Sequence, residues 1–226
     1  MRSLIMNLLF ILRFSQIVHS NMQASIIKFM ELTKKDLATL KGLVYTEGGL
    51  PLDQYSKDPN GINKNGIIYL YKIGQLTDEE FLSKMNEKLN STLDIDIFKE
   101  CWNAMCEIKE ENLPFIRRLQ ELQNEHGFGL HTIANTNKMH VDYIASQLNR
   151  KNINLNMSHS YSFEANQFDP EPSQEITNGR VVIDIRNIEV SNIEEKILEI
   201  LNTQEDLTSK PTTPPPSPKR LKLSPR

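Results

Sequence analysis

Three polar side chains come directly after apolar runs of the sequence, where the ends of buried strands would place them. They are Arg13, Asn135 and Asp184. In an open α/β sheet, ligands bind beyond the carboxyl ends of the strands. An arginine there attracts phosphate, an amide positions a bound group, and a carboxylate helps to bind Mg²⁺. For Asn135 and Asp184 we favour a structural interpretation, since both residue types commonly make local turns and cap strand ends.

The spacing of the other reactive side chains predicts neither a catalytic triad nor a metal site. Cys101 and Cys106 are five residues apart, which turns them about 140° from each other on a helix and argues against a disulfide. We interpret them as ordinary helix thiols in a reducing compartment. The Ser-His-Ser stretch at 158–160 has no partner placed by any pattern. Trp102 is expected to be a core aromatic, and His140 to pack and hydrogen-bond locally, with ligand contact as the alternative for His140.

The apolar run at 4–12 has two interpretations. It is too short for a transmembrane helix, which needs about 20 apolar residues, and we expect no membrane association. Central parallel strands have unbroken apolar sequences, so a buried first strand is favoured. A signal peptide over residues 1–20 stays open, because the run leads toward the small residues Ser20 and Ala24. Against it, Arg13 comes early and the cleavage pattern is poor.

Helical and strand patterns alternate along the chain. Apolar spacing, the Thr77–Glu80 capping box and Pro114 at a helix start are the main signals. The predicted helices lie at 24–44, 77–89, 95–105, 114–126, 138–149 and 193–201, and the predicted strands at 5–12, 128–134 and 181–185. This order predicts an α/β fold with a helical insertion after the first strand.

The charge distribution separates an acidic body from a basic tail. The chain has 226 residues, 38% of them hydrophobic and 24% charged, with a net charge of −3. The last twenty residues hold five Lys/Arg and no Asp/Glu, which leaves 21 basic against 29 acidic residues in the body, a net charge of −8. An acidic body argues against a broad nucleic-acid-binding surface. The tail from 208 is rich in proline and is expected to be disordered.

The basic residues of the tail form one compact cluster. Lys219, Arg220 and Lys222 follow Pro218, a pattern typical of a short nuclear-import peptide, and a solvated basic tail is the alternative. Proline-directed phosphorylation is a further hypothesis for the tail, at Thr213, Ser217 and Ser224.

Three stretches, taken in order, resemble one superfamily. Tyr71–Phe81 resembles the segment that enters the cap of haloacid dehalogenase-like (HAD-like) hydrolases, and Phe98–Met105 is similar to the Trp-Asn pair found in one branch of them. Leu130–His140 resembles their second motif, a strand that ends in Ser-Asn-Thr-Asn with a His three residues on. The resemblance covers about 5–205 and is strongest between 69 and 145. It implies a Rossmann-like parallel-sheet core with an inserted helical cap.

The resemblance also implies a site with four parts: an Asp nucleophile, a Ser/Thr hydroxyl, a Lys and a further acid that helps to bind Mg²⁺. At the nucleophile position this sequence has Arg13, or Ile11 in a register two residues earlier. At the hydroxyl position it has Ala134, next to Asn135. Asp184 matches the acidic motif and is the one candidate metal ligand, with Ile185 where the family has a second acid.

Substitutes for the missing groups are few. The hydroxyls of Thr132 and Thr136 lie two residues from the motif position, which would misplace them. No Lys occurs between 152 and 192, and the cations of that stretch are Arg180 and Arg186. The resemblance therefore implies a hydrolase fold with degenerate motifs.

We divide the chain into a HAD-like domain at 1–207, with its core at about 1–20 and 111–207 and its helical cap at about 21–110, and a basic tail at 208–226. We expect a binding or regulatory protein with a phosphate-bearing small ligand, an unidentified protein partner and no cofactor. An active phosphatase or dehalogenase with a displaced, Mg²⁺-dependent site is the alternative, and an exported or nuclear-targeted interaction protein is the second alternative. The expected location is the cytoplasm, or the nucleus of a eukaryotic cell if an import receptor binds the tail.

Overall fold

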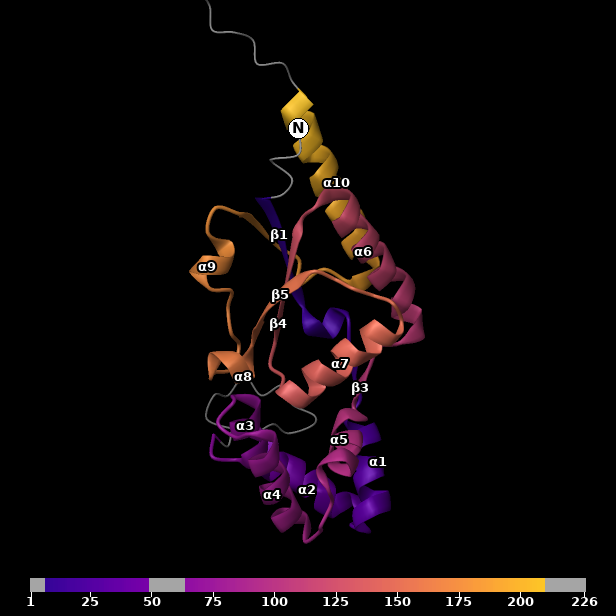
Figure 1. Ribbon diagram of the computed structural model, residues 1–226, viewed down its shortest axis with the longest axis vertical. Helices are drawn as coiled ribbons and strands as arrows, with labels where there is room; N and C mark the ends of the chain where they lie inside the picture. Colours follow the sequence, from indigo (N-terminus) through magenta and orange to yellow (C-terminus); the bar gives the residue numbers. More distant parts are fainter. Residues whose placement is uncertain (1–6, 49–63, 210–226) are drawn as a thin grey trace, which may run out of the picture.

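A four-stranded parallel sheet lies at the centre of the computed structural model, which describes residues 7–48 and 64–209 (Figure 1). Its strands, in spatial order, are β5 (Met157–Tyr161), β4 (Gly129–Ala134), β1 (Leu8–Arg13) and β6 (Val181–Asp184). β1 pairs in parallel with both β4 and β6. The predicted α/β fold class and the first strand are thus confirmed, and β1 is buried from Leu8 to Leu12, as an unbroken apolar run requires.

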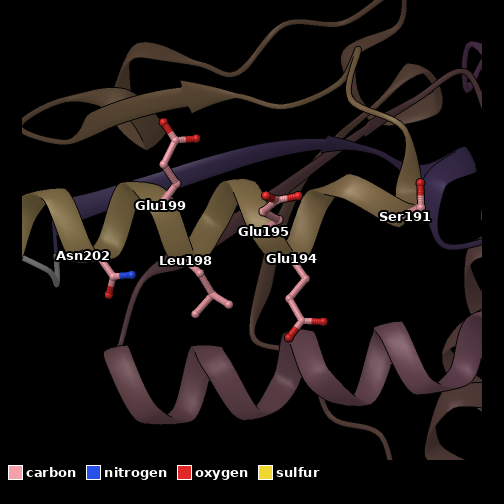
Figure 2. Close-up of a pocket in the computed structure, with 6 residues that line it drawn as sticks. All are labelled: Ser191, Glu194, Glu195, Leu198, Glu199 and Asn202. Atoms are coloured by element: carbon pink, nitrogen blue, oxygen red, sulfur yellow. The ribbon is translucent and has the colours of Figure 1, made fainter.

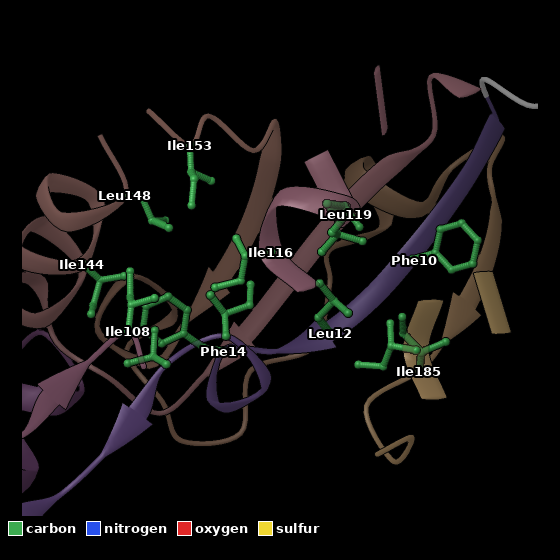
Figure 3. Close-up of a cluster of buried hydrophobic side chains, with 14 of the residues drawn as sticks. Phe10, Leu12, Phe14, Ile108, Ile116, Leu119, Ile144, Leu148, Ile153 and Ile185 are labelled. Atoms are coloured by element: carbon green, nitrogen blue, oxygen red, sulfur yellow. The ribbon is translucent and has the colours of Figure 1, made fainter. Parts of the chain in front are cut away.

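Three long helices complete the apolar core around the sheet. They are α6 (Leu113–His126), α7 (Lys138–Arg150) and α10 (Val190–Ser209). Phe10 and Leu12 of β1 belong to one buried cluster with Ile116 and Leu119 of α6 (Figure 3). Because Phe10, Leu119 and their neighbours are almost fully buried, this cluster is the main source of stability for the sheet.

The connection between β5 and β6 contains little helix. Residues 162–180 form α8 (Ser162–Ala165) and α9 (Gln174–Thr177), each one turn long. β6 is an edge strand, and its Val181 and Val182 remain 54% and 40% exposed. A longer crossover helix would ordinarily cover the side chains of such a strand.

In the described residues, five helices are inserted between the first strand and α6. They are α1 (Met22–Thr33), α2 (Leu37–Gly48), α3 (Ile67–Lys72), α4 (Asp78–Leu89) and α5 (Ile95–Asn103). We call the described residues 22–48 and 64–103 the helical segment. Its own apolar cluster is separate from that of the sheet, and Phe81 and Trp102 lie in it with ring centroids 5.0 Å apart. The Thr77–Glu80 capping box at the start of α4 is present, as predicted.

A short ribbon and several polar contacts join the helical segment to the sheet. The ribbon pairs β2 (His19–Ser20) with β3 (Cys106–Glu107), and the one-turn 3₁₀ helices Phe14–Gln16 and Glu110–Asn112 flank it. Gly74 follows α3 with φ +72°, and a Cβ there would lie 2.0 Å from the carbonyl oxygen of Phe163. Only glycine permits this approach of the helical segment to α8.

The structure corrects four details of the sequence analysis. The predicted helix at 24–44 is two helices, because Lys34 adopts a left-handed conformation (φ 57°) between them. Strand β5 was not predicted. Cys106 lies in β3 rather than in a helix, although both cysteines are free and buried as expected. The last helix extends to Ser209, beyond the predicted end of the folded part.

The domain boundaries stay predictions, and residues 210–226, including the basic cluster, lie outside the described residues. Among the described residues, no helix has the length and apolar character to cross a membrane.

Candidate functional site

The carboxyl edge of the sheet gathers the residues that the sequence singled out. Arg13 ends β1, Ala134 ends β4 and Asp184 ends β6. In the register, Ile11 pairs with Asp184 and Arg13 pairs with Ile133. The nucleophile, hydroxyl and acid positions of the motif therefore lie at one edge, as parallel strands require.

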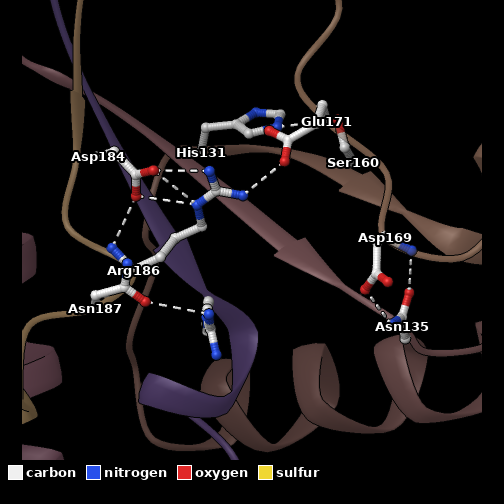
Figure 4. A network of polar contacts seen from close by, with 9 residues as sticks. His131, Asn135, Ser160, Asp169, Glu171, Asp184, Arg186 and Asn187 are labelled. Carbon is white, nitrogen blue, oxygen red and sulfur yellow. Dashed lines mark hydrogen bonds and ion pairs between the residues drawn. The ribbon is translucent and has the colours of Figure 1, made fainter. Parts of the chain in front are cut away.

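Asp184 is engaged by an arginine of its own loop. The Nε and Nη2 atoms of Arg186 donate to the two carboxylate oxygens at 3.0 and 2.7 Å, and the backbone N–H of Arg186 donates to Oδ1 at 3.0 Å (Figure 4). Arg186 also donates through Nη1 to Glu171 at 3.0 Å. The Arg186 hydrogen bonds hold the pKa of Asp184 below its ordinary value. The carboxylate is thus already neutralised.

Arg13 extends toward the same loop after β6. Its Nη2 donates to Asn187 Oδ1 at 3.2 Å, and its backbone N–H donates to Gln16 Oε1 at 2.7 Å. The Gln16 amide in turn donates to the carbonyls of Ile185 and Ile188, at 3.1 and 2.8 Å. These bonds fix the turn after β1 against the turn after β6. In neither register of the motif does β1 end in a carboxylate, because the two positions are Arg13 and Ile11.

Asn135 forms a reciprocal pair with the loop after α8. Its Nδ2 donates to Asp169 Oδ1 at 2.7 Å, and its Oδ1 accepts from the backbone N–H of Asp169 at 2.7 Å (Figure 4). Asp169 has a φ of 51°, a left-handed conformation that the pair helps to hold. The side chain therefore makes a turn-stabilising contact of the kind expected from the sequence, although between distant segments.

The two threonines that lie two residues from Ala134 in the sequence are both buried. The Thr132 hydroxyl lies 3.2 Å from the Tyr161 hydroxyl inside the core. The backbone N–H of Thr136 donates to Ser162 Oγ at 3.0 Å. Thr132 is therefore turned away from the edge of the sheet, and Ala134 itself brings no hydroxyl.

The sheet holds a polar network that the sequence did not predict. His131 of β4 is fully buried, with Nδ1 2.8 Å from Ser158 Oγ and Nε2 3.0 Å from Ser160 Oγ of β5. Burial lowers the pKa of His131 to about 4. The pattern could not be found in the sequence, because it depends on the register of a strand whose residues are mostly polar.

His140 links the helical segment to α7. Its Nε2 lies 3.3 Å from the Trp102 carbonyl oxygen, its Nδ1 lies 2.9 Å from Asn137 Nδ2, and its ring stacks on the indole with centroids 5.4 Å apart. Burial lowers its pKa to about 3. The imidazole is therefore neutral, and its contacts are the local packing and hydrogen bonding expected from the sequence.

The donor set at this edge fits Mg²⁺ poorly. Mg²⁺ needs near-octahedral oxygen ligands, usually including one or two carboxylates. The described residues contain no group of three His, Cys, Asp or Glu side chains placed to hold a metal ion. Asp184 would have to exchange a bidentate arginine for the ion. Arg13 adds a second positive charge nearby, which repels a cation and further lowers the pKa of Asp184.

Open cavities in the described part of the chain lie away from the strand ends. One, of about 450 Å³, lies along α10 beside α6, and three of its six lining residues are glutamates (Figure 2). Another, of about 470 Å³, lies between the start of α4, the loop before it and Lys138. Neither is lined by Arg13, Asn135 or Asp184.

Comparisons with known proteins identify the fold. No protein-family model matches the sequence, and no curated protein matches it. Among solved structures, the chain is similar to the HAD family enzyme bt-2542 from Bacteroides thetaiotaomicron in complex with magnesium and inorganic phosphate, with 17% identity, a TM-score of 0.55, and 86% of this chain and 90% of that chain covered. A predicted HAD-like family hydrolase from Porphyromonas gingivalis gives 15% identity and a TM-score of 0.53, with 91% and 99% covered. The chain therefore has the HAD-like hydrolase fold, as the three sequence stretches indicated.

Proposed function

We propose that this chain is a HAD-fold protein without hydrolytic activity, which acts by binding a phosphate-bearing small molecule and serves a regulatory role. The observation that carries the proposal is the end of β1. The fold's chemistry needs a carboxylate nucleophile there, and no Asp or Glu precedes Glu31 in the sequence. Arg13 and Ile11 occupy the two positions that the motif allows.

The other parts of the reaction are weakened in the same way. Ala134 brings no hydroxyl to hold the transferring group, and no Lys lies between 152 and 192 to neutralise its charge. Loss of one preorganised electrostatic group typically lowers the rate by about 10²–10³. These losses do not simply add, because such groups act as a unit. Without a nucleophile, however, the covalent route is closed.

Anion binding is the activity that the remaining residues support. The edge of the sheet keeps two arginines, of which Arg186 pairs with Asp184 and Glu171 and Arg13 donates to the neutral amide of Asn187. One solved relative of similar fold is described in complex with inorganic phosphate. A phosphate group bound near these side chains would be held by charge and hydrogen bonds, with no step that breaks a bond.

An active phosphatase or dehalogenase with a displaced site is the alternative, and it is favoured by the similarity to named enzymes. Its cofactor would be Mg²⁺, which relatives of this fold contain. The further alternative, an exported or nuclear-targeted interaction protein, rests on residues 1–20 and on the basic tail rather than on the site.

Phosphate release separates the first two proposals. The purified full chain is incubated with a panel of phosphomonoesters and Mg²⁺, beside an Asp184→Asn variant. We expect no release above the buffer blank from either protein. Release that scales with protein concentration and disappears in Asp184→Asn would establish the alternative. Binding of inorganic phosphate, followed by calorimetry, tests the positive part of the proposal.

A further inference from the structure

Strand β6 is the outermost strand on one side of the sheet, and its outer side is open. It pairs with β1 only, and no strand of the described chain lies beyond it. Val181, Val182 and Asp184 are all exposed, the two valines at 54% and 40%. An exposed edge strand presents a row of unpaired backbone groups that can pair with a strand of another chain.

The backbone bonds of β6 show which of its residues face outward. The N–H of Ile185, the residue after the strand, donates to the carbonyl oxygen of Ile11 at 3.0 Å, so it points toward β1. Successive residues of a strand direct their backbone groups to opposite sides. The N–H groups of Val182 and Asp184 therefore point away from β1, to the side that has no neighbouring strand.

The sequence of β6 lacks the features by which edge strands usually avoid pairing. Such strands carry Lys or Pro, or are interrupted by a bulge. The strand has the sequence Val-Val-Ile-Asp, and its four residues pair with β1 in one unbroken register. The opposite edge strand, β5, has the polar centre Ser-His-Ser. Of the two edge strands, β6 is thus the one whose sequence favours a further strand.

The charges at the two ends of β6 favour a second copy of this chain as the partner. Arg180 precedes the strand and Asp184 ends it. When two β6 strands pair in antiparallel orientation about a two-fold axis at Val182, each Arg180 lies opposite the partner's Asp184. Opposite charges that face each other across two strands stabilise the pair. An axis shifted to Ile183 would instead set Arg180 opposite the partner's Arg186.

Both charges are available for this contact. The guanidinium of Arg180 is exposed and makes no ion pair among the described residues. Its Nη1 lies 3.4 Å from the position that a Cβ on Gly129 would have, so the side chain lies over the sheet and must turn outward to reach a partner. Asp184 already pairs with Arg186, but 45% of its side chain remains exposed. A carboxylate can accept from a second guanidinium through its free lone pairs.

We propose that two copies of this chain pair through β6, in antiparallel orientation about an axis at Val182, and join their four-stranded sheets into one continuous sheet. The hydrogen bonds of the pair would form between the outward groups of Val182 and its copy, and between 180 and the partner's Asp184. Val181 would lie opposite the partner's Ile183. This inference goes beyond the proposed function and does not depend on it.

The mass of the protein in solution tests the proposal. Sedimentation equilibrium of the full chain should give a weight-average mass that rises from 26.1 kDa toward twice that value as the concentration is raised. In Val182→Lys two ammonium groups face each other across the axis, and we expect a Kd for the dimer at least about tenfold higher. Ile97→Lys on α5 is the matched control, because Ile97 is exposed to the same degree, at 39%.

A disulfide cross-link tests the position of the axis and covers the case in which Val182→Lys does not fold. Residues that form a hydrogen-bonded antiparallel pair have Cα atoms about 5.5 Å apart, which suits a disulfide. Val182→Cys and Ile97→Cys are treated with oxidised glutathione, which is reduced as the two thiols are oxidised. Because Cys101 and Cys106 are buried, we expect a covalent dimer from Val182→Cys and none from Ile97→Cys.

Each outcome decides for or against this interface. A full chain that stays monomeric at every concentration would overturn the proposal and leave the open side of β6 to a different partner. A dimer that Val182→Lys does not weaken, or that Val182→Cys does not cross-link, would also overturn it, because its interface must lie elsewhere. Phosphate release and phosphate binding test the proposed function separately, so the failure of either proposal leaves the other standing.

Discussion

The guanidinium of Arg186 contacts both carboxylate oxygens of Asp184, with 2.7 Å between Nη2 and Oδ2 and 3.0 Å between Nε and Oδ1. The contact lies at the strand end where a HAD-like site would use its acid for a metal ion. Asp184 is therefore paired with Arg186 instead of being free to bind a metal ion. The Nη1 atom of the same guanidinium lies 3.0 Å from Oε1 of Glu171.

Replacement of Arg186 by Met should lower the free energy of unfolding by about 1 kcal/mol, because the ion pair is partly exposed and is screened by solvent. Urea unfolding near neutral pH measures the change, with Arg150→Met as a control on an exposed arginine that contacts a serine. A loss no larger than that of the control would show that the pair contributes nothing.

The same ion pair predicts a dependence on pH. Arg186 lowers the pKa of Asp184 in the folded state, so the stabilisation is complete above the unfolded-state pKa of about 3.9 and is lost as the pH falls through the lower folded-state value. The difference in stability between the full chain and Arg186→Met should therefore vanish at strongly acidic pH. A difference that persists there would mean that Arg186 acts by packing.

Two buried imidazoles should make the protein less stable at mildly acidic pH. The pKa values of His131 and His140 are lowered to about 4 and about 3, whereas an unfolded histidine titrates near about 6.5. Below about pH 6.5 the unfolded state binds protons that the folded state excludes, at a cost of up to about 1.4 kcal/mol per pH unit for each group.

Urea unfolding at several pH values between neutral and moderately acidic pH measures this effect. The slope of stability against pH should be reduced in His131→Asn and retained in His126→Asn, since His126 is partly exposed at the end of α6. An unchanged slope in His131→Asn would show that the imidazole in the sheet is not neutral in the folded state.

Ser162 should be important for the attachment of the helical segment. Its buried hydroxyl contacts the carbonyl of Lys72 and both backbone groups of Thr136. In Ser162→Ala these groups lose their partner, and we expect a loss of about 1–3 kcal/mol in the free energy of unfolding. Ser83→Ala, on an exposed face of α4, is the control. Thermal unfolding of the two variants checks the difference.

The tail prediction concerns residues outside the described part of the chain. Nuclear import receptors recognise charge along an extended peptide, so replacing Lys219, Arg220 and Lys222 together by Ala should abolish nuclear accumulation of a tagged protein in a eukaryotic cell. An identical distribution with and without the three side chains would refute the import interpretation.

The sequence predicted the parts of the fold that have strong local signals. Several predicted elements have the expected structure: the apolar runs of β1 and β4, the capping box at Thr77 and the helix at 114–126. Strand β5 was missed because its Met-Ser-His-Ser-Tyr sequence has no apolar run. Its position follows from pairing with β4, which is a tertiary effect.

The sequence predicted where the candidate residues lie in the fold, but not which contacts their side chains make. Sequence positions placed Arg13 and Asp184 at one edge of the sheet, and the register shows that they lie there. The contact between Arg186 and Asp184, only two residues apart, was open to prediction from that spacing. The contact between Asn135 and Asp169 was not, because it joins segments that are far apart in the sequence.

The most direct test of the central claim is a search for a covalent phosphoryl-enzyme. The full chain is mixed with a phosphomonoester carrying a labelled phosphate and with Mg²⁺, quenched in acid and analysed for label on the protein. Because β1 ends without a carboxylate nucleophile, we predict no label above that of a denatured control, and none in Arg13→Asp, since Ala134 and the missing lysine would remain. Label that appears on the unmodified chain and turns over with time would contradict the account and show that the displaced site is active.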